Sequence, residues 1–223
     1  MSRAEEIATN IAALEARIAA ACERVGRARG DVRLVAVTKT FPVADVERAI
    51  AAGMTDVGEN KVQEARDKKP GVASSARWHL IGHLQSNKAK DAVRLFDVIQ
   101  TVDSVELAEK LGRAAEGIGK RQEVLLQVNV GREAQKSGAE PEEVPELVKR
   151  IASIPSIHVN GLMTIPPLGD PRSHFRELRA MRDDLGLAEL SMGMTDDFET
   201  AIEEGATIIR VGRAIFGSRE GSR

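Results

Sequence analysis

The chain has 223 residues, of which 42% are hydrophobic and 30% are charged. This composition is that of a globular protein with enough apolar material for one core, and it excludes an intrinsically disordered chain. The 32 Lys and Arg residues and the 34 Asp and Glu residues leave a net charge of −2, so no overall positive field exists to attract nucleic acid or a membrane. We therefore expect any anion-binding site to be local.

Cysteine usage and the N-terminal residues indicate which cellular compartment to expect. Cys22 is the only cysteine, so the chain can form neither an internal disulfide nor a pair of thiols for zinc or redox chemistry. The first eight residues lack the apolar core of a signal peptide, and nowhere do about 18 apolar residues run without interruption. From these features we expect a cytoplasmic protein.

Helix and strand signals alternate along the chain after an N-terminal helix. The apolar residues Ile7, Ile11, Leu14 and Ile18 recur at helical spacing, which predicts an amphipathic helix over residues 3–25. Apolar runs then predict strands over residues 33–38, 56–58, 78–81, 98–101, 124–130, 157–163, 190–192 and 207–211. Helical patterns that follow these strands predict helices over residues 42–52, 61–68, 89–95, 105–118, 141–151, 171–185, 196–204 and 213–216.

Eight strand–helix units in succession indicate an α/β protein. Each parallel pair of strands needs a right-handed helical crossover, so this order predicts a single-domain (β/α)8 TIM barrel over residues 1–223 with an extra N-terminal helix. A typical barrel has roughly 250 residues, so the loops of this one must be short. An open doubly wound sheet is the alternative architecture, and it would need no eighth strand.

A charged side chain, Lys39, directly follows the first predicted strand. In a barrel the residues that carry chemistry lie at the carboxyl ends of the strands, so the amine of Lys39 is a candidate for Schiff-base formation. A solvated loop charge is the simpler interpretation of a lysine at this place.

Glycine-bearing turns follow the last two predicted strands, at Ser191-Met192-Gly193-Met194 and Arg210-Val211-Gly212-Arg213. The loops after strands seven and eight of a barrel commonly bind phosphate through backbone N–H groups and a helix dipole. Tight turns or close helix packing would also explain these glycines. An amine and an anion site on the same rim suit a phosphorylated carbonyl compound.

Other motifs give weaker indications. His79 and His83 lie four residues apart but span a strand and a turn, so we expect no metal site. The sequence has no Walker loop and no strand-linked Gly-x-Gly-x-x-Gly, so neither nucleoside triphosphates nor dinucleotides are indicated. Charged pairs on predicted helices, such as Arg176 and Arg179, are interpreted as a solubilising surface.

Seven segments, spread in order over nearly the whole chain, resemble the pyridoxal-phosphate homeostasis proteins, also called the YggS/PROSC family. They are Ala36-Val37-Thr38-Lys39-Thr40, Gly58-Glu59-Asn60-Lys61-Val62-Gln63-Glu64, Trp78-His79-Leu80-Ile81-Gly82-His83-Leu84-Gln85-Ser86-Asn87-Lys88, Lys136-Ser137-Gly138, Gly161-Leu162-Met163-Thr164, Ser191-Met192-Gly193-Met194 and Arg210-Val211-Gly212-Arg213-Ala214-Ile215-Phe216-Gly217. The order of the seven segments makes the resemblance specific, although each segment alone is not.

The resemblance implies a barrel of the alanine racemase N-terminal type that holds pyridoxal 5′-phosphate as an internal aldimine on Lys39. It further implies that the cofactor-binding residues include Asn60, Ser191, Met192, Arg210, Gly212 and Arg213. Of these, Ser191, Gly212 and Arg213 match the positions that hold the phosphate in the family. Many members have Thr at the position of Arg213, so either its guanidinium or the backbone alone is expected to bind the phosphate.

By the same resemblance, Asn60 falls near the cofactor ring, and Arg210 falls where an arginine faces the pyridine nitrogen. The place of Arg210 implies weak catalysis. A neighbouring cation keeps that nitrogen unprotonated, and the ring is then a poor electron sink. Racemases that resemble this barrel use a tyrosine from a second domain as the opposing acid or base, and this sequence contains no Tyr. Racemisation by that route is therefore not expected.

These features together predict a binding protein that acts in intracellular pyridoxal phosphate (vitamin B6) homeostasis and is not an enzyme. Two alternatives stay open: a weak pyridoxal-phosphate-dependent racemase or Schiff-base enzyme, and a regulator that delivers the cofactor to apo-enzymes. The expected partners are pyridoxal phosphate and such apo-enzymes, with no nucleic acid, no membrane and no metal. The chain is expected to be a monomer or a weak dimer.

Overall fold

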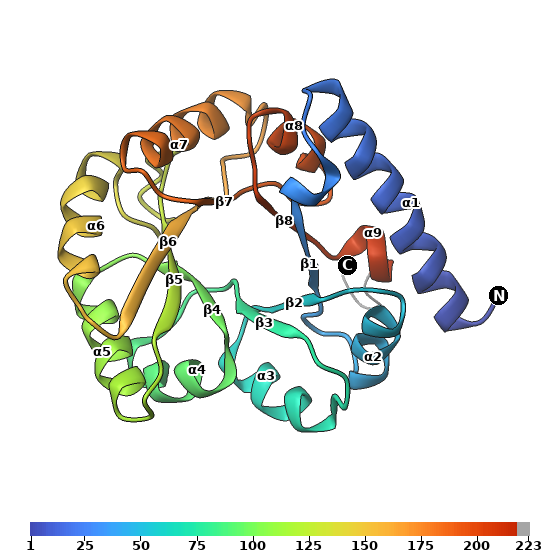
Figure 1. Cartoon of the computed structure of the whole chain (residues 1–223), viewed down its shortest axis with the longest axis horizontal. Coiled ribbons are helices and arrows are strands. Elements are labelled where there is room, and N and C mark those ends of the chain that lie inside the picture. Colours follow the sequence, from blue (N-terminus) through green and yellow to red (C-terminus); the bar gives the residue numbers. More distant parts are fainter. Residues whose placement is uncertain (218–223) are drawn as a thin grey trace.

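The computed structural model describes residues 1–217, and in this part of the chain eight parallel strands form a closed barrel in sequence order (Figure 1). Pairing of the first strand with the last closes the sheet, with Val35 opposite Arg210. The strands are β1 (Arg33–Val37), β2 (Asp56–Glu59), β3 (Arg77–Leu80), β4 (Val98–Val102), β5 (Gln122–Gln127), β6 (Ile157–Met163), β7 (Glu189–Ser191) and β8 (Ile208–Val211). The predicted barrel is confirmed, and the open sheet is wrong. The predicted domain limit at residue 223 lies outside the described residues.

The helices form a ring around the barrel (Figure 1). They are α1 (Arg3–Arg24), α2 (Val43–Ala51), α3 (Val62–Lys68), α4 (Ala89–Leu95), α5 (Val105–Glu116), α6 (Val144–Ala152), α7 (Arg172–Asp184), α8 (Phe198–Glu203) and α9 (Arg213–Phe216). Short 3₁₀ turns lie at Arg29–Asp31, Lys69–Gly71, Ser86–Lys88 and Pro141–Glu143. Most predicted helices agree with the observed ones to within two residues.

Helix α1 precedes the repeating units and packs outside them, against α2, α8 and α9. It begins with a capping box, in which Ser2 Oγ accepts from the Glu5 N–H and the Glu5 carboxylate accepts from the Ser2 N–H. Its predicted apolar face is the buried face, since Ile7 and Ile18 are fully buried. Helix α1 therefore joins elements from the two ends of the chain.

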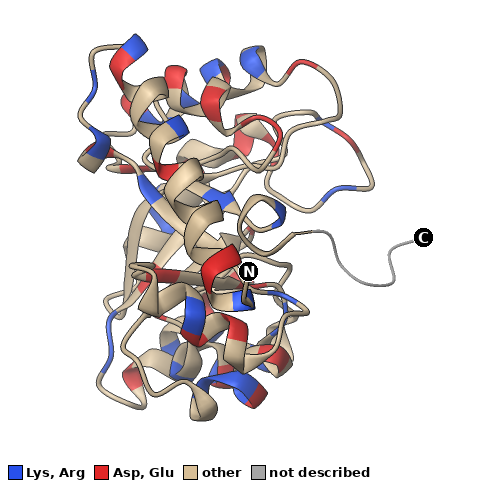
Figure 2. Cartoon of the chain, turned by 90° about the vertical axis from the view of Figure 1, so that its right-hand side faces the viewer, with Lys and Arg blue, Asp and Glu red and all other residues tan. Residues whose placement is uncertain are grey.

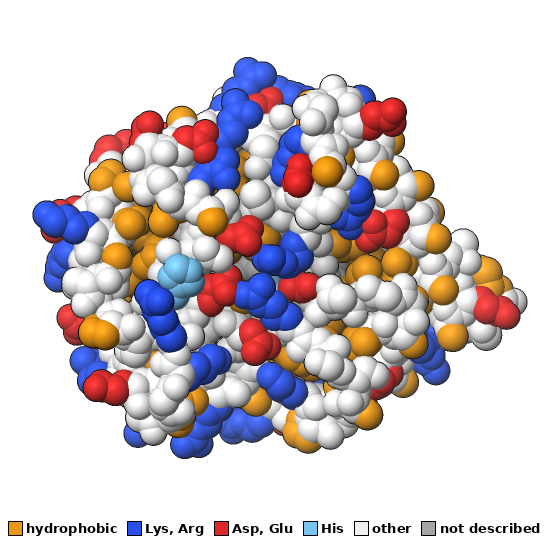
Figure 3. All heavy atoms as spheres, in the orientation of Figure 1, with side chains coloured by type: hydrophobic (Ala, Val, Ile, Leu, Met, Phe, Trp, Pro, Cys, Tyr) orange, Lys and Arg blue, Asp and Glu red, His pale blue; other side chains and the backbone are white. Residues whose placement is uncertain are grey.

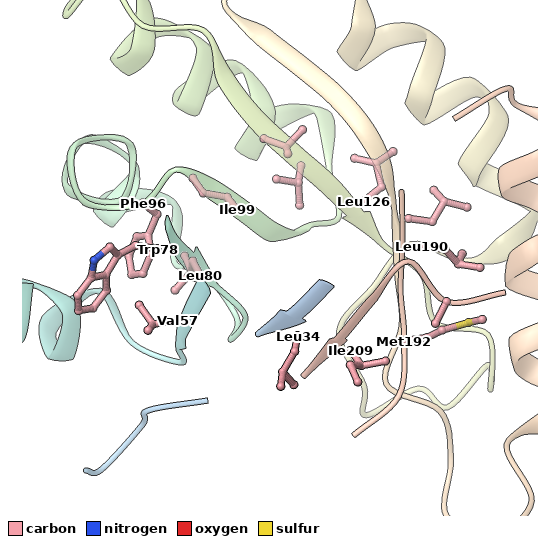
Figure 4. Close-up of a cluster of buried hydrophobic side chains, with 14 of the residues drawn as sticks. Leu34, Val57, Trp78, Leu80, Phe96, Ile99, Leu126, Leu190, Met192 and Ile209 are labelled. Carbon is pink, nitrogen blue, oxygen red and sulfur yellow. The ribbon is translucent and has the colours of Figure 1, made fainter. Parts of the chain in front are cut away.

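The main core lies between the strands and the helices. Strand side chains alternate between the two faces of the sheet, so one set faces the helices and the other faces the barrel axis. Figure 4 shows part of this core. It includes the outer strand residues Leu34, Val57, Trp78, Leu80, Ile99, Leu126, Leu190 and Ile209, together with Phe96, which follows α4, and Met192, which follows β7. A second, smaller apolar cluster belongs to the inner set and consists of Val35, Val98, Leu125, Met163 and Ile208.

One predicted strand differs from the observed one by more than one residue at both ends. The apolar pattern predicts a strand over residues 124–130, whereas β5 begins at Gln122 and ends at Gln127. Val128 and Val130 are buried, but they lie in the loop after the strand, where Val128 makes an isolated bridge to Ala139. The apolar signal there comes from packing of the loop and not from the sheet.

The surface carries interspersed charges of both signs. Figure 2 shows them along the helices from the side, and Figure 3 shows both signs at the centre of the face in view. Some pairs join neighbouring helices, as Arg17 with Glu199 and Arg24 with Glu203 join α1 to α8. No helix within residues 1–217 combines the length and apolar character that a membrane-spanning segment requires.

The interpretation of Arg176 and Arg179 as a purely solubilising surface needs correction. Glu204, directly after α8, is buried, and its carboxylate accepts from Arg172 at 2.6 Å and from Arg176 at 3.0 Å. Arg179 donates to the Glu204 carbonyl at 3.4 Å. The arginines of α7 therefore hold the end of α8, a contact that no local pattern in α7 indicates.

Candidate functional site

A cavity of about 220 Å³ opens at the carboxyl ends of the first and last strands. Its polar lining consists of Lys39, Asn60, Thr195, Asp196, Arg210 and Arg213, and its apolar lining includes Val37, Phe41, Ile81, Ile165 and Met194. These residues come from the carboxyl ends of β1 and β8 and from the loops after β1, β2, β3, β6, β7 and β8, which only barrel closure brings together. The carboxyl end of the barrel is the face where sites of this fold lie.

Lys39 lies in a tight turn directly after β1. The Phe41 N–H donates to the Thr38 carbonyl at 3.1 Å, and Thr40 has a positive φ of 69°. A left-handed conformation at a β-branched residue is strained, so it persists only where neighbouring groups hold it. The turn brings Lys39 to the cavity wall, with its side chain half-buried.

Charged residues of β2 and α3 hold the backbone on both sides of Lys39. The Lys68 ammonium donates to the Thr38 carbonyl and to the buried Glu59 carboxylate, each at 2.8 Å. Thr38 Oγ1 donates to the same carboxylate at 2.6 Å, and the Thr40 N–H donates to Glu64 at 2.8 Å. The turn that carries Lys39 is thus fixed before and after the lysine.

The two carboxylates of this cluster differ in their environment. Burial raises the pKa of Glu59 above its usual value, although hydrogen bonds from Lys68 and Thr38 act in the opposite direction. Burial also acts to raise the pKa of Glu64, but the hydrogen bond from the Thr40 N–H and the charge of Lys68 outweigh it and lower the value. Glu64 is therefore the more firmly ionised anion beside the turn.

Arg210 lines the same cavity from β8 and is almost fully buried, with 4% of its surface exposed. One of its terminal nitrogens donates to Ser191 Oγ at 2.6 Å and the other to the Thr164 carbonyl at 2.8 Å. Burial lowers the pKa of Arg210 to about 10, with the charge of Asp197 acting in the opposite direction. The guanidinium remains a cation at neutral pH, and its two hydrogen bonds fix its orientation.

The loop after β8 offers an anion site at the rim. Arg213 begins α9, in which the Ile215 and Phe216 N–H groups donate to the Gly212 carbonyl, whereas the first two N–H groups, of Arg213 and Ala214, have no acceptor within the helix. A Cβ at Gly212 would lie only 3.2 Å from the Val37 carbonyl, so a glycine allows β8 to approach β1 here. The Arg213 side chain is exposed at the rim and forms an ion pair with Asp196.

Two of the predicted site residues do not line the cavity. The alternation of side chains along and just beyond β7 explains where each of them lies instead. Ser191 faces the barrel axis, where its hydroxyl is buried against Arg210. Met192 faces the helices and belongs to the outer core (Figure 4). Gly193, with a φ of 93°, makes the turn toward α8 and packs against it, since a Cβ would lie 2.5 Å from that of Ala201.

The structure thus brings Lys39, Asn60, Arg210, Gly212 and Arg213 together at one cavity. An amine, a buried cation and first-turn N–H groups at one site suit a small anion that carries a carbonyl group. Within residues 1–217 no group of His, Cys, Asp or Glu side chains is arranged to hold a metal ion.

The sequence patterns do not reveal the residues that orient the site. From the sequence, Lys68 is expected to be an exposed charge on a helix. Its spacing of four residues from Glu64 is the one sequence feature that predicts an ion pair between them. His79, considered above only for metal binding, is fully buried inside the barrel. The alternation of Trp78, His79 and Leu80 is the signal that would have placed this histidine on the opposite face from its apolar neighbours.

Comparison with known proteins agrees with this geometry. Residues 9–220 match the family model described as "Alanine racemase, N-terminal domain". The chain is 42% identical over 221 residues to the Pyridoxal phosphate homeostasis protein of Pseudomonas aeruginosa, covering 96% of both chains. It is 41% identical to the protein of that name from Aquifex aeolicus, covering 92% of this chain and 94% of the relative.

A solved structure is similar over the same extent. PipY of Synechococcus elongatus PCC7942, a structure with PLP bound, is 36% identical and has a TM-score of 0.83. The match covers 95% of this chain and 100% of PipY.

Proposed function

This chain belongs to the alanine racemase N-terminal domain family and, within it, to the pyridoxal phosphate homeostasis proteins, and from that premise we propose that it is a carrier of pyridoxal 5′-phosphate. The observation that carries the proposal is one cavity lined by Lys39, Arg210 and Arg213. The full-length similarity to PipY, solved with PLP bound, supports the same ligand.

Lys39 is the covalent attachment point in this proposal. Pyridoxal phosphate would supply an aldehyde, the group with which the primary amine of Lys39 can form a Schiff base. The turn held by Lys68, Glu59 and Glu64 directs the amine to the cavity. Because these contacts hold the backbone of the turn, mainly the Lys39 side chain has to be ordered on binding, so this cluster favours capture.

The other lining residues hold the two ends of the ligand. The Arg213 N–H and Gly212 offer a place for the phosphate at the rim, and the Arg213 guanidinium lies beside it in its ion pair with Asp196. Asn60 lies near the ring in this proposal. We place Ser191 and Met192 behind the cavity wall, where Ser191 acts through Arg210 and Met192 through packing.

Arg210 explains why the proposed protein is a carrier and not an enzyme. A buried cation that faces the pyridine nitrogen disfavours protonation there, and an unprotonated ring stabilises a carbanion poorly. The chain contains no Tyr to serve as an opposing acid or base. Release of the held aldehyde to apo-enzymes in the cytoplasm completes the proposed role, with the whole chain acting as one domain and as a monomer or weak dimer.

Absorption spectroscopy of the purified protein with added pyridoxal phosphate tests the proposal. The wild type is expected to be yellow, and borohydride reduction followed by peptide mapping should find the pyridoxyl group on Lys39. Lys39→Ala should lose the band and the adduct but keep weaker, phosphate-dependent binding. Lys61→Ala removes a nearby exposed lysine and should behave as wild type.

Two results would overturn the proposal. One is an uncoloured wild-type protein without a pyridoxyl adduct. The other is steady conversion of L-alanine to D-alanine by the loaded protein at an enzymatic rate, because it would favour the racemase alternative.

A further inference from the structure

A continuous line of five polar side chains crosses the interior of the barrel, and we call it the interior chain. Arg210 donates to Ser191 Oγ at 2.6 Å, and Ser191 Oγ donates to Gln100 Oε1 at 2.6 Å. Gln100 Nε2 lies 2.9 Å from His79 Nδ1, and His79 Nε2 lies 2.8 Å from Asp56 Oδ1. The residues come from β8, β7, β4, β3 and β2, so the line crosses the barrel interior between Ser191 of β7 and Gln100 of β4.

The interior chain is buried along its whole length. Ser191, Gln100 and His79 are fully buried, and Arg210 and Asp56 expose 4% and 5% of their surface. The inner apolar cluster of Val35, Val98, Leu125, Met163 and Ile208 occupies the rest of the interior. A buried polar group without a hydrogen-bond partner destabilises the folded state, so all four hydrogen bonds of the interior chain have to form together.

The chemistry of each group fixes the direction of every hydrogen bond. Arg210 can only donate, so Ser191 Oγ accepts from it and its single hydrogen points to Gln100 Oε1. The Gln100 amide nitrogen can only donate, so His79 Nδ1 must accept. The ring proton then lies on His79 Nε2 and points to the Asp56 carboxylate. All four bonds run the same way, from a cation to an anion.

The two ends of the interior chain lie at two different cavities. Arg210 lines the cavity that contains Lys39, whereas Asp56 lines a cavity of about 690 Å³ formed mainly by residues at the amino ends of the strands. Arg33 and Glu189 line this second cavity too, and Arg33 lies 3.7 Å from Asp56 and 3.1 Å from Glu189. Burial acts to raise the pKa of Asp56, but the hydrogen bonds from His79 and Thr55 act against it, and the pKa is lowered overall. Asp56 therefore stays an anion, as the direction of the bonds requires.

We propose that Gln100, His79 and Asp56 are positioning residues for Arg210. Gln100 takes the Ser191 hydrogen and does not compete for the Oγ lone pairs, so the hydroxyl is left to bind the guanidinium at the wall of the Lys39 cavity. If His79 Nδ1 carried a proton, the Gln100 amide would have to turn over, and Ser191 would then face two donors and lose its acceptor. The orientation of Arg210 thus depends on Asp56, an anion that begins β2 and lines the other cavity. The contact of Arg210 with the pyridine ring rests on the proposed function. Its orientation does not, because it follows from the hydrogen bonds of the protein alone.

Nitrogen NMR of the full-length protein without ligand tests the interior chain itself. In the wild type, two-bond correlations should find His79 with its proton on Nε2, and the Arg210 guanidinium N–H signals should exchange slowly with water. Gln100→Met keeps the side-chain size but removes both polar groups. It should speed exchange at Arg210 by about fivefold, the change expected when a neutral hydrogen bond that supports its Ser191 partner is lost. Asp56→Asn keeps an acceptor but removes the charge, and it should allow the other His79 tautomer.

Glu189→Gln is the matched control, because Glu189 also pairs with Arg33 at the same end of the barrel but is not part of the interior chain. It should leave the His79 tautomer and the Arg210 exchange as in wild type. Thermal unfolding of each variant identifies any that fails to fold, and Asp56→Asn keeps the test available if Gln100→Met is one of them. The inference is overturned if wild-type His79 has its proton on Nδ1, or if folded variants leave Arg210 exchange and the His79 tautomer unchanged.

The same variants loaded with pyridoxal phosphate provide a second readout. Gln100→Met and Asp56→Asn should shift the absorption maximum of the bound cofactor and weaken its binding, whereas Glu189→Gln should do neither. If the wild type binds no pyridoxal phosphate, the proposed function fails, and the NMR result still decides the interior chain. If the cofactor binds but no variant changes its spectrum or the NMR signals, only the inference fails.

Discussion

At the scale of single residues, the site depends on a strained turn held by charged neighbours. Thr40 adopts a left-handed conformation that a β-branched residue rarely has, and its N–H is satisfied by Glu64 at 2.8 Å. Lys68 holds the other side of Lys39 through the Thr38 carbonyl. The position of Lys39 is therefore a property of α3 as much as of β1.

Glu64→Ala tests this dependence. It should lower the stability by about 1–3 kcal/mol at neutral pH, because it removes an ionised acceptor from the Thr40 N–H, and it should weaken pyridoxal phosphate binding several-fold. The pKa of Glu64 is lowered in the folded state, so the unfolded state binds more protons in acid. The stability gap between wild type and variant should therefore be complete above the usual pKa of 4.5 and should close as the pH falls through the folded value.

Denaturant titrations at several pH values measure this gap. Asp67→Ala is the control, since Asp67 is an exposed carboxylate of the same helix that bonds only to Gln63. Equal effects of the two variants on ligand binding would show that the Thr40 contact does not hold the site.

At the scale of elements, α1 supports the closure of the barrel. It packs against α2, α8 and α9, so it covers the place where the first and last units meet. Its N-terminal Arg3 reaches both ends of the chain, donating to the buried Asp45 of α2 at 3.0 Å and to the Phe216 carbonyl of α9 at 2.8 Å. Helix α1 therefore connects the first and last units of the barrel.

Leu14→Ala tests the contribution of α1. Leu14 is 2% exposed, and removing a buried leucine leaves a cavity, so we expect a loss of about 2–5 kcal/mol in the free energy of unfolding. Glu23→Ala, at an exposed position of the same helix, should change stability by less than about 0.5 kcal/mol. Chemical denaturation followed by circular dichroism compares the two, and similar midpoints would contradict the packing role.

At the scale of the whole molecule, a closed sheet has no edge strand, so its units depend on one another. Pairing of β1 with β8 joins residues about 175 positions apart in sequence, as in Arg33 with Ile208. The site cavity lies at this junction, with Lys39 on one side and Arg210 on the other. Any opening between the two strands would separate them.

The single thiol, Cys22, can show whether α1 and the barrel unfold together. Cys22 lies on the buried face of α1, and burial raises the pKa of its thiol, so both access and reactivity are low in the folded protein. Labelling by a thiol reagent should be slow without denaturant and should follow the same transition as circular dichroism. Labelling at denaturant concentrations well below that transition would mean that α1 detaches before the barrel opens.

The sequence by itself determined the number and order of the strand–helix units and the place of Lys39 at the end of β1. Period-two and period-3.6 patterns are local, so each short segment reports its own structure and its apolar face. Of the residues that the family resemblance predicted for the site, Lys39, Asn60, Arg210, Gly212 and Arg213 share one cavity, and their role there stays a prediction.

Only the tertiary structure decided which polar groups meet. Glu204 with the arginines of α7, Lys68 with Thr38, and Ser191 with Gln100 are pairs far apart in sequence. A charged or polar residue looks the same in sequence whether it is solvated or buried against a partner, because nothing local records the partner. Strand alternation turned Ser191 inward and Met192 outward, and barrel closure then gave Ser191 its two partners.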